Sequence, residues 1–333
     1  MKVAVIGAGS WGTALAQVVA KNNNEVLLWA RKDEVVRGIN ENHANPRYLS
    51  DVALSKNITA TKSHEEALSG AQACVIVMPS STLRETAQAM APFVSDTLPI
   101  IICSKGVEAK TGMVGVEIFE DVLGNVSRLA ALSGPNHAEE VILGTPSATV
   151  IASANEQTTQ LFQELFATFS FRTYASTDVL GVELCAAFKN VIAIATGCAY
   201  GLGYGDNTAA MLQTRGLAEM SRLVTACGGQ ALTCMGLAGT GDMIVTCMSR
   251  HSRNRRLGEM IAQGKTLDDF TAETHMVAEG ANACRNVKVL ADRYGVDLPI
   301  ADAVRSVVWE GADPKLLARD LTSRSLKPEF YGI

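Results

Sequence analysis

Short apolar runs alternate with amphipathic stretches through the first half of the chain. The first run, residues 3–6, is apolar and mostly β-branched, as in a strand of a parallel sheet that is buried on both faces. Glycines follow it, and most of residues 13–20 beyond them are good helix formers. Further strands are predicted at 25–29, 73–78, 98–103, 129–133 and 148–152, with helical stretches such as 81–90 between them. Strands that alternate with helices predict a doubly wound, Rossmann-like α/β domain.

The pattern changes beyond about residue 178. Strand-like alternation largely disappears there, and the segments 179–200, 208–226 and 257–261 are predicted as helices. We place the junction within 171–178, which predicts a Rossmann-like domain over 1–178 and a mostly α-helical domain over 179–333. Two domains fit the length of 333 residues, because a single hydrophobic core stops growing at roughly 250–300 residues.

Composition narrows the class of protein further. Apolar residues make up 47% of the chain and charged residues 19%, which excludes an intrinsically disordered protein. The net charge of −5 lacks the basic footprint of a nucleic-acid binder, so we expect no nucleic-acid partner.

Cysteine usage and the length of apolar runs bear on location. The eight cysteines include no C-x-x-C pair and no cluster with histidine at zinc spacing, so we expect reduced thiols and no metal site. We expect no signal peptide, because the chain leads directly into the first strand, and no apolar run long enough to span a bilayer. These features predict a cytoplasmic protein that does not insert into a membrane.

Gly7, Gly9 and Gly12 form a G-x-G-x-x-G motif that follows a strand and opens a helix. In this context one glycine permits a tight turn, one lets the backbone approach a pyrophosphate, and one allows close packing of helix on strand. The N–H groups and the dipole at the helix N-terminus favour an anion. The motif predicts bound NAD(P); a glycine-rich turn without a ligand is the alternative.

The end of the second strand bears on the choice of cofactor. NAD-selective sites carry Asp or Glu there, which holds the ribose 2′-hydroxyl. Here Arg31 and Lys32 follow the strand, and no carboxylate comes before Asp33. Two cations can hold a 2′-phosphate, so we predict that NADPH is accepted, while the ratio of NADPH to NADH use stays open. The alternative is that both cations are ordinary surface residues at a helix start.

Lys189 lies within a predicted helix that is apolar on nearly every side and is therefore buried. A lysine on such a helix either extends its ammonium group to water or places it in a polar cavity. In a cavity, desolvation lowers the pKa of a lysine toward the range that suits proton transfer. The apolar surroundings and the adjacent Asn190 leave these two interpretations evenly matched.

The most basic run of this acidic chain, residues 249–256, follows a glycine-rich segment that ends in Asp242. Its arginines, with Ser252 and Asn254, suit a phosphate group, because the guanidinium fork and neutral donors match phosphate oxygens. The alternatives are a solvated basic helix end for this run and a helix N-cap for Asp242. Lys105, at the end of a predicted strand, lies where open α/β sheets bind ligands, although surface lysines at strand ends are also common.

Six short segments are spread in order over nearly the whole chain. They read GAGSWGTA at 7–14, SKG at 104–106, SGP at 133–135, ELCAAFKN at 183–190, GTGD at 239–242 and SRN at 252–254. Each is only moderately specific by itself. Together, in this order and spacing, they closely resemble the bacterial NAD(P)-dependent sn-glycerol-3-phosphate dehydrogenases.

The resemblance implies reversible hydride transfer from NAD(P)H to dihydroxyacetone phosphate, giving sn-glycerol 3-phosphate for glycerophospholipid biosynthesis. It also implies a homodimer, with 179–333 as the substrate-binding and dimerisation domain. It implies that Lys189 is the proton donor and acceptor and that Lys105 orients the substrate and touches the cofactor. Besides these two lysines, the implied substrate-binding residues are Gly134, Asn136, Asp242, Ser252, Arg253 and Asn254. The implied cofactor-binding residues are Gly7, Gly9, Ser10, Trp11, Gly12, Arg31, Tyr48, Lys105, Ala138, Arg253, Val277 and Glu279. Asn136 stands where the family usually has Ser or Thr, and its amide can still donate and accept a hydrogen bond.

Two other functions fit the same architecture. One is a hydroxyacid dehydrogenase with a Rossmann domain and a helical second domain, in which a lysine and an asparagine on a helix also carry the chemistry. The other is a regulatory module that binds NAD(P) without turnover. The donors at 252–254 favour a phosphorylated substrate over a hydroxyacid, and a desolvated Lys189 has no use in a sensor.

Overall fold

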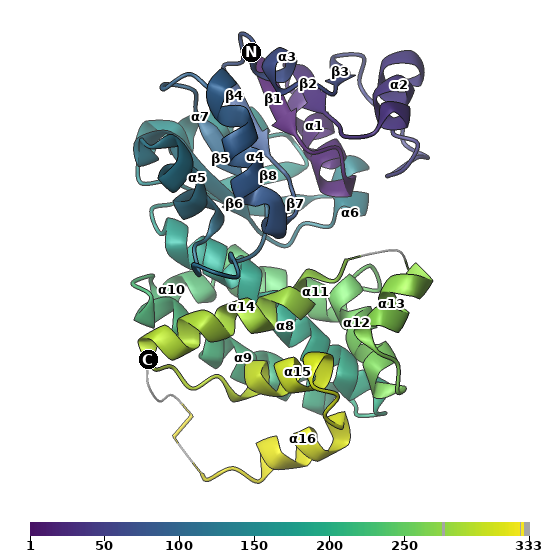
Figure 1. The fold of residues 1–333 in the computed structure, drawn as a ribbon, viewed down its shortest axis with the longest axis vertical. Helices are drawn as coiled ribbons and strands as arrows, with labels where there is room; N and C mark the ends of the chain where they lie inside the picture. The colour runs from purple at the N-terminus through teal and green to yellow at the C-terminus, as the bar shows by residue number, and fades with distance from the viewer. Residues whose placement is uncertain (275–276, 327, 330–333) are drawn as a thin grey trace. The chain divides into compact units, whose positions relative to one another are not determined.

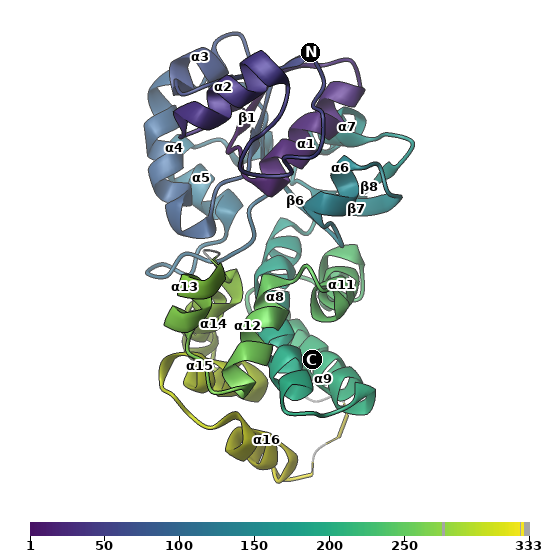
Figure 2. The same ribbon diagram turned by 90° about the vertical axis from the view of Figure 1, so that its right-hand side faces the viewer.

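The chain forms an eight-stranded sheet flanked by helices, followed by a set of helices (Figures 1 and 2). The structure is a computed structural model that describes residues 1–274, 277–326 and 328–329. It divides into two compact units: residues 1–105 and 115–179 form unit 1, and residues 106–114 and 180–333 form unit 2. The predicted class, a Rossmann-like α/β domain followed by a mostly α-helical one, is confirmed.

The sheet of unit 1 has the strand order β3-β2-β1-β4-β5-β6-β7-β8. Neighbouring strands are parallel except β6 and β7, which are antiparallel. The strands are β1 (Lys2–Ile6), β2 (Glu25–Trp29), β3 (Ile58–Thr61), β4 (Ala73–Ile76), β5 (Ile100–Ile102), β6 (Leu129–Ser133), β7 (Ser147–Ala152) and β8 (Phe171–Ser176). The chain runs from β1 outward to β3 and then crosses back to β4, which makes a topological switch point beside β1. Open α/β sheets bind ligands outside the carboxyl ends of the strands at such a point.

The six predicted strands are present, and β3 and β8 extend the sheet beyond them. The predicted boundary after residue 178 lies one residue from the observed division after Val179. Within the segment 171–178, where the junction was expected, residues 171–176 form a strand of the sheet. β8 pairs in parallel with β7 along its whole length and buries Phe171, so it belongs to the sheet of unit 1. All of its other residues are partly or fully exposed, which is why no apolar run marks it as a strand.

Helices cover both faces of the sheet (Figure 2). One face carries α1 (Ser10–Lys21), α6 (Ala138–Ile142) and α7 (Glu156–Phe166), and the other carries α3 (His64–Leu68), α4 (Leu83–Met90) and α5 (Gly115–Leu123). α2 (Asp33–Asn42) packs against β3, and short 3₁₀ turns occupy Ser80–Thr82, Ala91–Phe93 and Val126–Arg128. Because both faces are covered, β4 and β6 are buried at every position, which explains their continuous apolar sequences.

Unit 2 is built around α8 (Val179–Gly201), in which residues 181–194 are all buried. The helices that follow it are α9 (Asp206–Ala226), α10 (Ala231–Cys234), a π-helical turn (Leu237–Gly241), α11 (Asp242–Met248), α12 (Arg253–Ala262), α13 (Leu267–Thr274), α14 (Glu279–Tyr294), α15 (Pro299–Trp309) and α16 (Pro314–Thr322). The expectation that no apolar segment is long enough to span a bilayer is wrong, because α8 and the segment 231–248 both qualify by length and composition. For α8 the structure gives a physical reason: 83% of its apolar window is buried, as in the central helix of a core.

Residues 106–114 leave unit 1 and join unit 2, which corrects the predicted domain boundaries. Val107 and Val114 are buried in the hydrophobic core of unit 2. The side chain of Asn286 donates to the carbonyl of Val107, and Arg293 Nη2 donates to the carbonyl of Thr111 at 2.7 Å. Contacts with α14, which is remote in the sequence, hold residues 106–114 in unit 2. No change in composition distinguishes this segment from its neighbours in the sequence.

Candidate active site

A buried polar cluster lies in the otherwise apolar core of unit 2. Lys189 Nζ, from α8, donates to Asp242 Oδ1 at 2.8 Å and to Thr246 Oγ1 at 2.6 Å. Thr246 Oγ1 also lies 3.3 Å from Asp242 Oδ1. Lys189 is 6% exposed and Asp242 1% exposed. Of the two interpretations of Lys189, the structure therefore bears out the polar cavity and not the extension to solvent.

The local sequence places both partners of Lys189 on α11. A π-helical turn precedes α11. Only glycine fits at position 239 of this turn, because a Cβ there would lie 2.1 Å from the carbonyl oxygen of Cys234. Such turns are frequent at functional sites. α11 then begins at Asp242, and Thr246 lies one turn later on the same face. Thr246 was missed in the sequence, although its spacing of four residues from Asp242 was a signal that could have found it.

Cys247, next to Thr246, offers no nucleophile to this cluster. Burial raises the pKa of its thiol to about 11, so the group stays protonated at neutral pH. Asp242 and Thr246 thus hold the ammonium group of Lys189 in a fixed direction, in surroundings from which water is largely excluded. Such an arrangement can donate a hydrogen bond to a substrate oxygen and transfer a proton to it.

The basic run forms the start of α12. Ser252 is the N-cap, and its hydroxyl accepts from the N–H of Arg255 at 3.2 Å. The first turn carries arginines and no acidic residue, although cations oppose the positive end of the helix dipole. Arg255 is paired with Glu259 at 2.8 Å, whereas the exposed Arg253 makes no ion pair with any residue that the structure describes. This charge pattern favours an anionic ligand at the start of α12.

Asn254 is buried and joins three helices. Its Nδ2 donates to Asn190 Oδ1 at 2.9 Å, and its Oδ1 accepts from the backbone N–H of Gly280 at 2.9 Å. These bonds bring the start of α12 next to the start of α14, where Glu279 is the first helical residue and Val277 is 60% exposed. The predicted residues 252–254 and 277–279 therefore lie together in unit 2.

In unit 1, the glycine motif forms the turn between β1 and α1. Gly7 has a φ of +118°, and a Cβ there would lie 2.4 Å from the carbonyl oxygen of Val77, beyond the end of β4. A Cβ at Gly12 would lie 1.8 Å from the carbonyl oxygen of Gly7, whereas a Cβ at Gly9 would meet no atom within 4 Å. Gly7 and Gly12 thus make the turn, and Gly9 faces open space at the switch point.

The N-terminus of α1 fits the pyrophosphate of a dinucleotide. Gly9 is the N-cap with no side-chain cap, and no acidic residue lies in the first turn. The indole Nε1 of Trp11 is buried without a hydrogen-bond partner among the described residues. Ser10 starts the helix next to it. Free donors and the helix dipole gather at one point, which is the arrangement that binds phosphate groups.

Tyr48 is tied to the glycine turn through Asn45, a residue that the sequence interpretation missed. Asn45 is fully buried, and its Nδ2 donates to the carbonyl of Ala8 at 3.0 Å and to Thr13 Oγ1 at 2.8 Å. Its Oδ1 accepts from the backbone N–H of Tyr48 at 3.2 Å. The Asn-Pro dipeptide at 45–46 marks a turn, but it does not reveal these partners.

A second group of predicted residues lies at the carboxyl ends of β5 and β6. Lys105 Nζ donates to the carbonyl of Gly134 at 3.2 Å. Asn136 Nδ2 donates to the carbonyl of Ala148 at 2.9 Å, while its Oδ1 is buried with no hydrogen-bond partner among the described residues. Ala138, at 7% exposure, begins α6. The buried Oδ1 is a free acceptor suited to a ligand hydroxyl.

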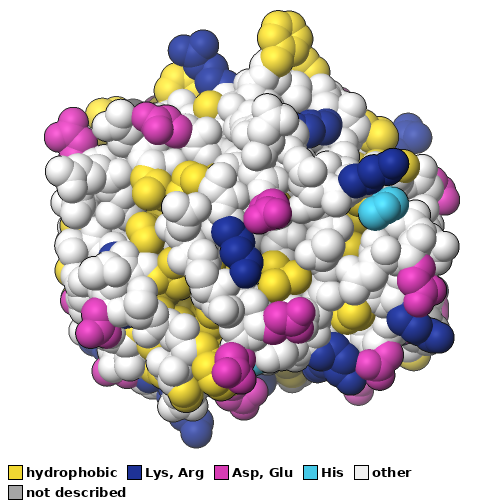
Figure 3. All heavy atoms as spheres, turned by 90° about the horizontal axis from the view of Figure 1, so that it is seen from above, with side chains coloured by type: hydrophobic (Ala, Val, Ile, Leu, Met, Phe, Trp, Pro, Cys, Tyr) yellow, Lys and Arg dark blue, Asp and Glu magenta, His cyan; other side chains and the backbone are white. Residues whose placement is uncertain are grey.

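Metal chemistry has no candidate site in residues 1–274, 277–326 and 328–329, where no group of three His, Cys, Asp or Glu side chains could hold an ion. His275 lies outside the described residues. All eight cysteines are free thiols, as predicted. On the face in Figure 3, the described acidic and basic side chains are interspersed rather than gathered into a basic stripe.

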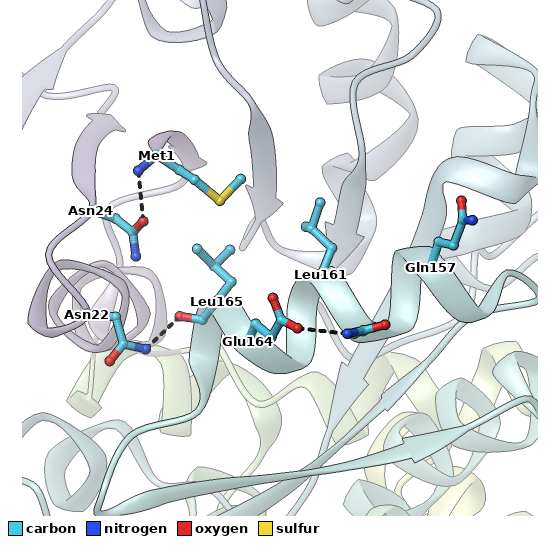
Figure 4. A pocket seen from close by; sticks show the side chains of 8 residues that line it. Met1, Asn22, Asn24, Gln157, Leu161, Glu164 and Leu165 are labelled. Atoms are coloured by element: carbon cyan, nitrogen blue, oxygen red, sulfur yellow. Dashed lines mark hydrogen bonds between the residues drawn. The ribbon is translucent and has the colours of Figure 1, made fainter.

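A cavity of about 380 Å³ lies between the start of the chain, the end of α1 and α7 (Figure 4). Its polar groups bond to one another: the N-terminal amine donates to Asn24 Oδ1 at 3.1 Å, and Asn22 Nδ2 donates to the carbonyl of Leu165 at 3.1 Å. None of the predicted site residues lines it, so it does not bear on the candidate site.

Comparisons with known proteins agree with this chemistry. Residues 2–159 match the family model for the N-terminus of NAD-dependent glycerol-3-phosphate dehydrogenase, and residues 178–319 match the model for its C-terminus. Proteins named glycerol-3-phosphate dehydrogenase (NAD(P)+) from Shouchella clausii and Corynebacterium urealyticum are similar to the chain, with 43% and 45% identity. These alignments cover 100% of this chain and 98% of the first relative, and 99% of this chain and 100% of the second. A crystal structure of glycerol-3-phosphate dehydrogenase from Coxiella burnetii is 35% identical, with a TM-score of 0.93 over 97% of this chain and 99% of that chain.

Proposed function

The chain belongs to the NAD-dependent glycerol-3-phosphate dehydrogenase family, and from this premise we propose that Lys189, with Asp242 and Thr246, carries the proton transfer of the reaction. The chain is an NAD(P)-dependent oxidoreductase that interconverts dihydroxyacetone phosphate and sn-glycerol 3-phosphate. The observation that carries the proposal is the buried ion pair of Lys189 and Asp242 at 2.8 Å.

In the direction of reduction, bound NAD(P)H supplies the hydride that the carbonyl carbon of the substrate accepts. The ammonium group of Lys189 donates a hydrogen bond to the carbonyl oxygen and then gives that oxygen a proton as negative charge develops on it. Asp242 keeps the ammonium form favourable, and Thr246 Oγ1 fixes the direction of Nζ. The buried setting excludes water and strengthens these electrostatic interactions.

We assign the substrate phosphate to the start of α12. Arg253 is exposed on the first turn and offers a planar fork of donors, and the Ser252 hydroxyl and backbone N–H groups lie beside it. Asn254 supports this segment, because both ends of its amide bond to Asn190 and Gly280. Its predicted contact with the substrate then depends on the remaining N–H of the amide.

The residues of unit 1 hold the cofactor and orient the substrate in this proposal. Gly7, Gly9 and Gly12 shape the turn, and Ser10 and Trp11 donate to the pyrophosphate. The other cofactor contacts are assigned to Arg31, Tyr48, Lys105, Ala138, Arg253, Val277 and Glu279. Lys105, Gly134 and Asn136 orient the substrate, and the free acceptor of Asn136 suits a substrate hydroxyl.

The start of α12 and the buried Lys189 of α8 also separate the alternatives. A hydroxyacid needs no phosphate site at Arg253, and a sensor needs no buried ammonium at Lys189. Family membership favours the phosphorylated triose over both alternatives. A homodimer in the cytoplasm, without membrane insertion and without nucleic acid, stays a prediction.

The test is oxidation of NADPH, and then of NADH, followed at about 340 nm with dihydroxyacetone phosphate or unphosphorylated dihydroxyacetone as substrate. Turnover of the phosphorylated ketone alone supports the proposal, and it is the expected result. Equal turnover of both ketones would contradict the phosphate site. No turnover of either ketone, with NADPH still bound, would move the substrate to the hydroxyacids or support the sensor.

A further inference from the structure

Charged residues gather where β2 and β3 end side by side. Trp29 and Thr61 are partners in the register of these two parallel strands, and they are the last residues of each. The residues that follow are therefore neighbours in space: Arg31 and Lys32 after β2, and Lys62 after β3. A third cation, Lys62, therefore lies near Arg31 and Lys32, although it is about 30 residues away in the sequence.

The position of Lys62 is fixed by Trp29. The indole Nε1 of Trp29 donates to the carbonyl of Lys62 at 2.9 Å. The same indole ring stacks on the ring of His64, with centroids 4.5 Å apart and an angle of 16° between the planes. The backbone on both sides of Lys62 is thus anchored to the end of β2.

Lys62 pairs with Asp33, the first carboxylate after β2. Lys62 Nζ lies 2.8 Å from Asp33 Oδ1, in the first turn of α2. The hydrogen bond and charge of Lys62 lower the pKa of Asp33, so this carboxylate is ionised at neutral pH. The next carboxylate, Glu34, is paired in turn with Arg47 at 2.6 Å. Arg31 is exposed and makes no ion pair within the described part of the chain.

We propose that Lys62 determines cofactor specificity: by neutralising Asp33 it lets Arg31 hold the 2′-phosphate of NADPH. This inference rests on the proposed function, because it requires the adenosine ribose to lie at the end of β2. A carboxylate at that place accepts a hydrogen bond from a ribose 2′-hydroxyl and repels a 2′-phosphate. Lys62 removes that repulsion. It is a positioning residue that acts through Asp33, and it is not itself the phosphate ligand.

The pair is exposed, with side-chain exposures of 52% for Lys62 and 76% for Asp33, so its loss leaves the fold intact. Removing the charge of Lys62 affects the ligand instead, because the 2′-phosphate then lies near the unpaired carboxylate of Asp33. Lys62→Met keeps the length of the side chain and deletes the charge. Lys62→Arg keeps the charge. Lys56→Met is a matched control, since Lys56 is an exposed lysine before the other end of β3.

The experiment uses two probes that undergo no hydride transfer, adenosine 2′,5′-bisphosphate and adenosine 5′-monophosphate, titrated into the full chain by calorimetry. We expect Lys62→Met to weaken the binding of the bisphosphate by about tenfold and the binding of the monophosphate by less than about twofold. Lys62→Arg and Lys56→Met keep the wild-type affinities. In an Asp33→Asn background, Lys62→Met loses most of its effect, because the carboxylate that it exposes is absent.

An unchanged ratio of the two affinities in Lys62→Met would overturn the inference. A loss of bisphosphate binding that persists in full in the Asp33→Asn background would overturn it as well, because Lys62 would then be a direct ligand of the phosphate. Failure of the wild-type chain to bind either adenosine phosphate would instead overturn the proposed function, on which the inference depends.

Discussion

Lys189 and Asp242 form an ion pair of 2.8 Å in which the side chains are only 8% and 2% exposed. The two residues come from α8 and α11 and are 53 positions apart in the sequence. Moving two charges out of water is unfavourable, and replacing such a pair by apolar residues is often neutral or stabilising. Because a buried ion pair is a poor way to stabilise a core, its presence here points to a chemical role for the ammonium group.

Asp242→Asn is expected to reduce kcat by about 100-fold, because it removes the charged acceptor of a buried ammonium group and so disfavours the charged form of Lys189. The pH profile of kcat should move to lower pH for the same reason. Lys189→Met should abolish turnover. Steady-state kinetics over a range of pH measures both effects, and NADPH titration checks that cofactor binding is kept.

Asp292→Asn is the control, because Asp292 belongs to an exposed ion pair with Lys288 on α14. It should leave kcat and its pH profile unchanged. A full kcat in Lys189→Met would remove the proposed proton transfer from this cluster.

Thr246→Val should lower kcat by about tenfold, since the substitution keeps the shape of the side chain and removes the acceptor 2.6 Å from Lys189 Nζ. KM for dihydroxyacetone phosphate should change less than kcat, because Thr246 orients the lysine and is not assigned to the phosphate. Thr246→Ser restores the acceptor and should recover most of the rate. Equal losses in the Val and Ser variants would show that packing, not the hydroxyl, matters at this position.

Arg253→Ala should raise KM for dihydroxyacetone phosphate by at least about tenfold, because a charged fork at the phosphate is lost. kcat should change less than KM, because Arg253 is assigned to the phosphate and not to the reacting carbonyl group. Arg256→Ala is the matched control, since Arg256 is also an exposed arginine in the first turn of α12. The same rise in KM for both variants would mean that general positive charge attracts the substrate and that Arg253 makes no specific contact.

Gly9→Ala and Gly12→Ala should fail in different ways. A Cβ at Gly12 would lie 1.8 Å from the carbonyl oxygen of Gly7, so Gly12→Ala should destabilise unit 1 by at least about 2 kcal/mol. A Cβ at Gly9 meets no atom within 4 Å, and its φ of −75° suits alanine, so Gly9→Ala should fold normally. Gly9→Ala should nevertheless weaken NADPH binding by about tenfold or more, because the methyl group occupies the approach of the pyrophosphate.

Thermal unfolding and NADPH titration of the two variants separate these outcomes. Gly70→Ala is no control, because its φ of +70° would add strain of its own. Gly205 has a φ of −93°, and a Cβ there would meet no atom within 4 Å, so Gly205→Ala serves better. Wild-type NADPH affinity in Gly9→Ala would place the cofactor elsewhere.

Local patterns predicted much of the fold and part of the site. The strand before Gly7 and the helix after Gly12 were predictable because a buried parallel strand and a glycine turn each leave a mark within a few residues. The burial of α8 followed from its apolar character on all sides, whereas the sequence left a buried and a solvent-exposed ammonium group of Lys189 evenly matched.

The remaining features depend on contacts between distant segments. β8 is a strand because β7 lies beside it, and residues 106–114 join unit 2 because α14 binds their carbonyl groups. Asn45 and Thr246 are ordinary polar residues in the sequence until the fold supplies the glycine turn and Lys189 as their partners. Pairings of this kind leave no periodic pattern, so one sequence alone does not reveal them.

Glu219 provides a test of electrostatics away from the candidate site. This glutamate on α9 is 2% exposed, and its two carboxylate oxygens accept from the N–H groups of Ile300 and Ala301, at 2.8 and 3.2 Å, in the first turn of α15. Burial raises the pKa of Glu219 to about 8, although these two hydrogen bonds and the nearby Arg222 oppose the rise. The ordinary value for glutamate is 4.5.

Between these two pKa values the folded chain keeps a proton that the unfolded chain has released. The free energy of unfolding must therefore fall as pH rises through this window, by at most about 1.4 kcal/mol per pH unit from this group. The stabilising contribution is fully present below the unfolded pKa of 4.5 and is lost as pH approaches 8. Glu219→Gln does not titrate, so its stability should lack this slope.

Urea unfolding of the wild type and Glu219→Gln from about pH 5 to about pH 8 measures the difference. The variant begins less stable, because its amide can accept only one of the two N–H groups and presents a donor to the other. As pH rises, the wild type should lose stability relative to the variant, so the gap between them narrows. Glu273→Gln, at an exposed glutamate of α13, should show a constant gap. A gap that stays constant over this range would mean that the bonds to α15 outweigh burial and keep Glu219 ionised in the folded chain, because both states would then have released the proton.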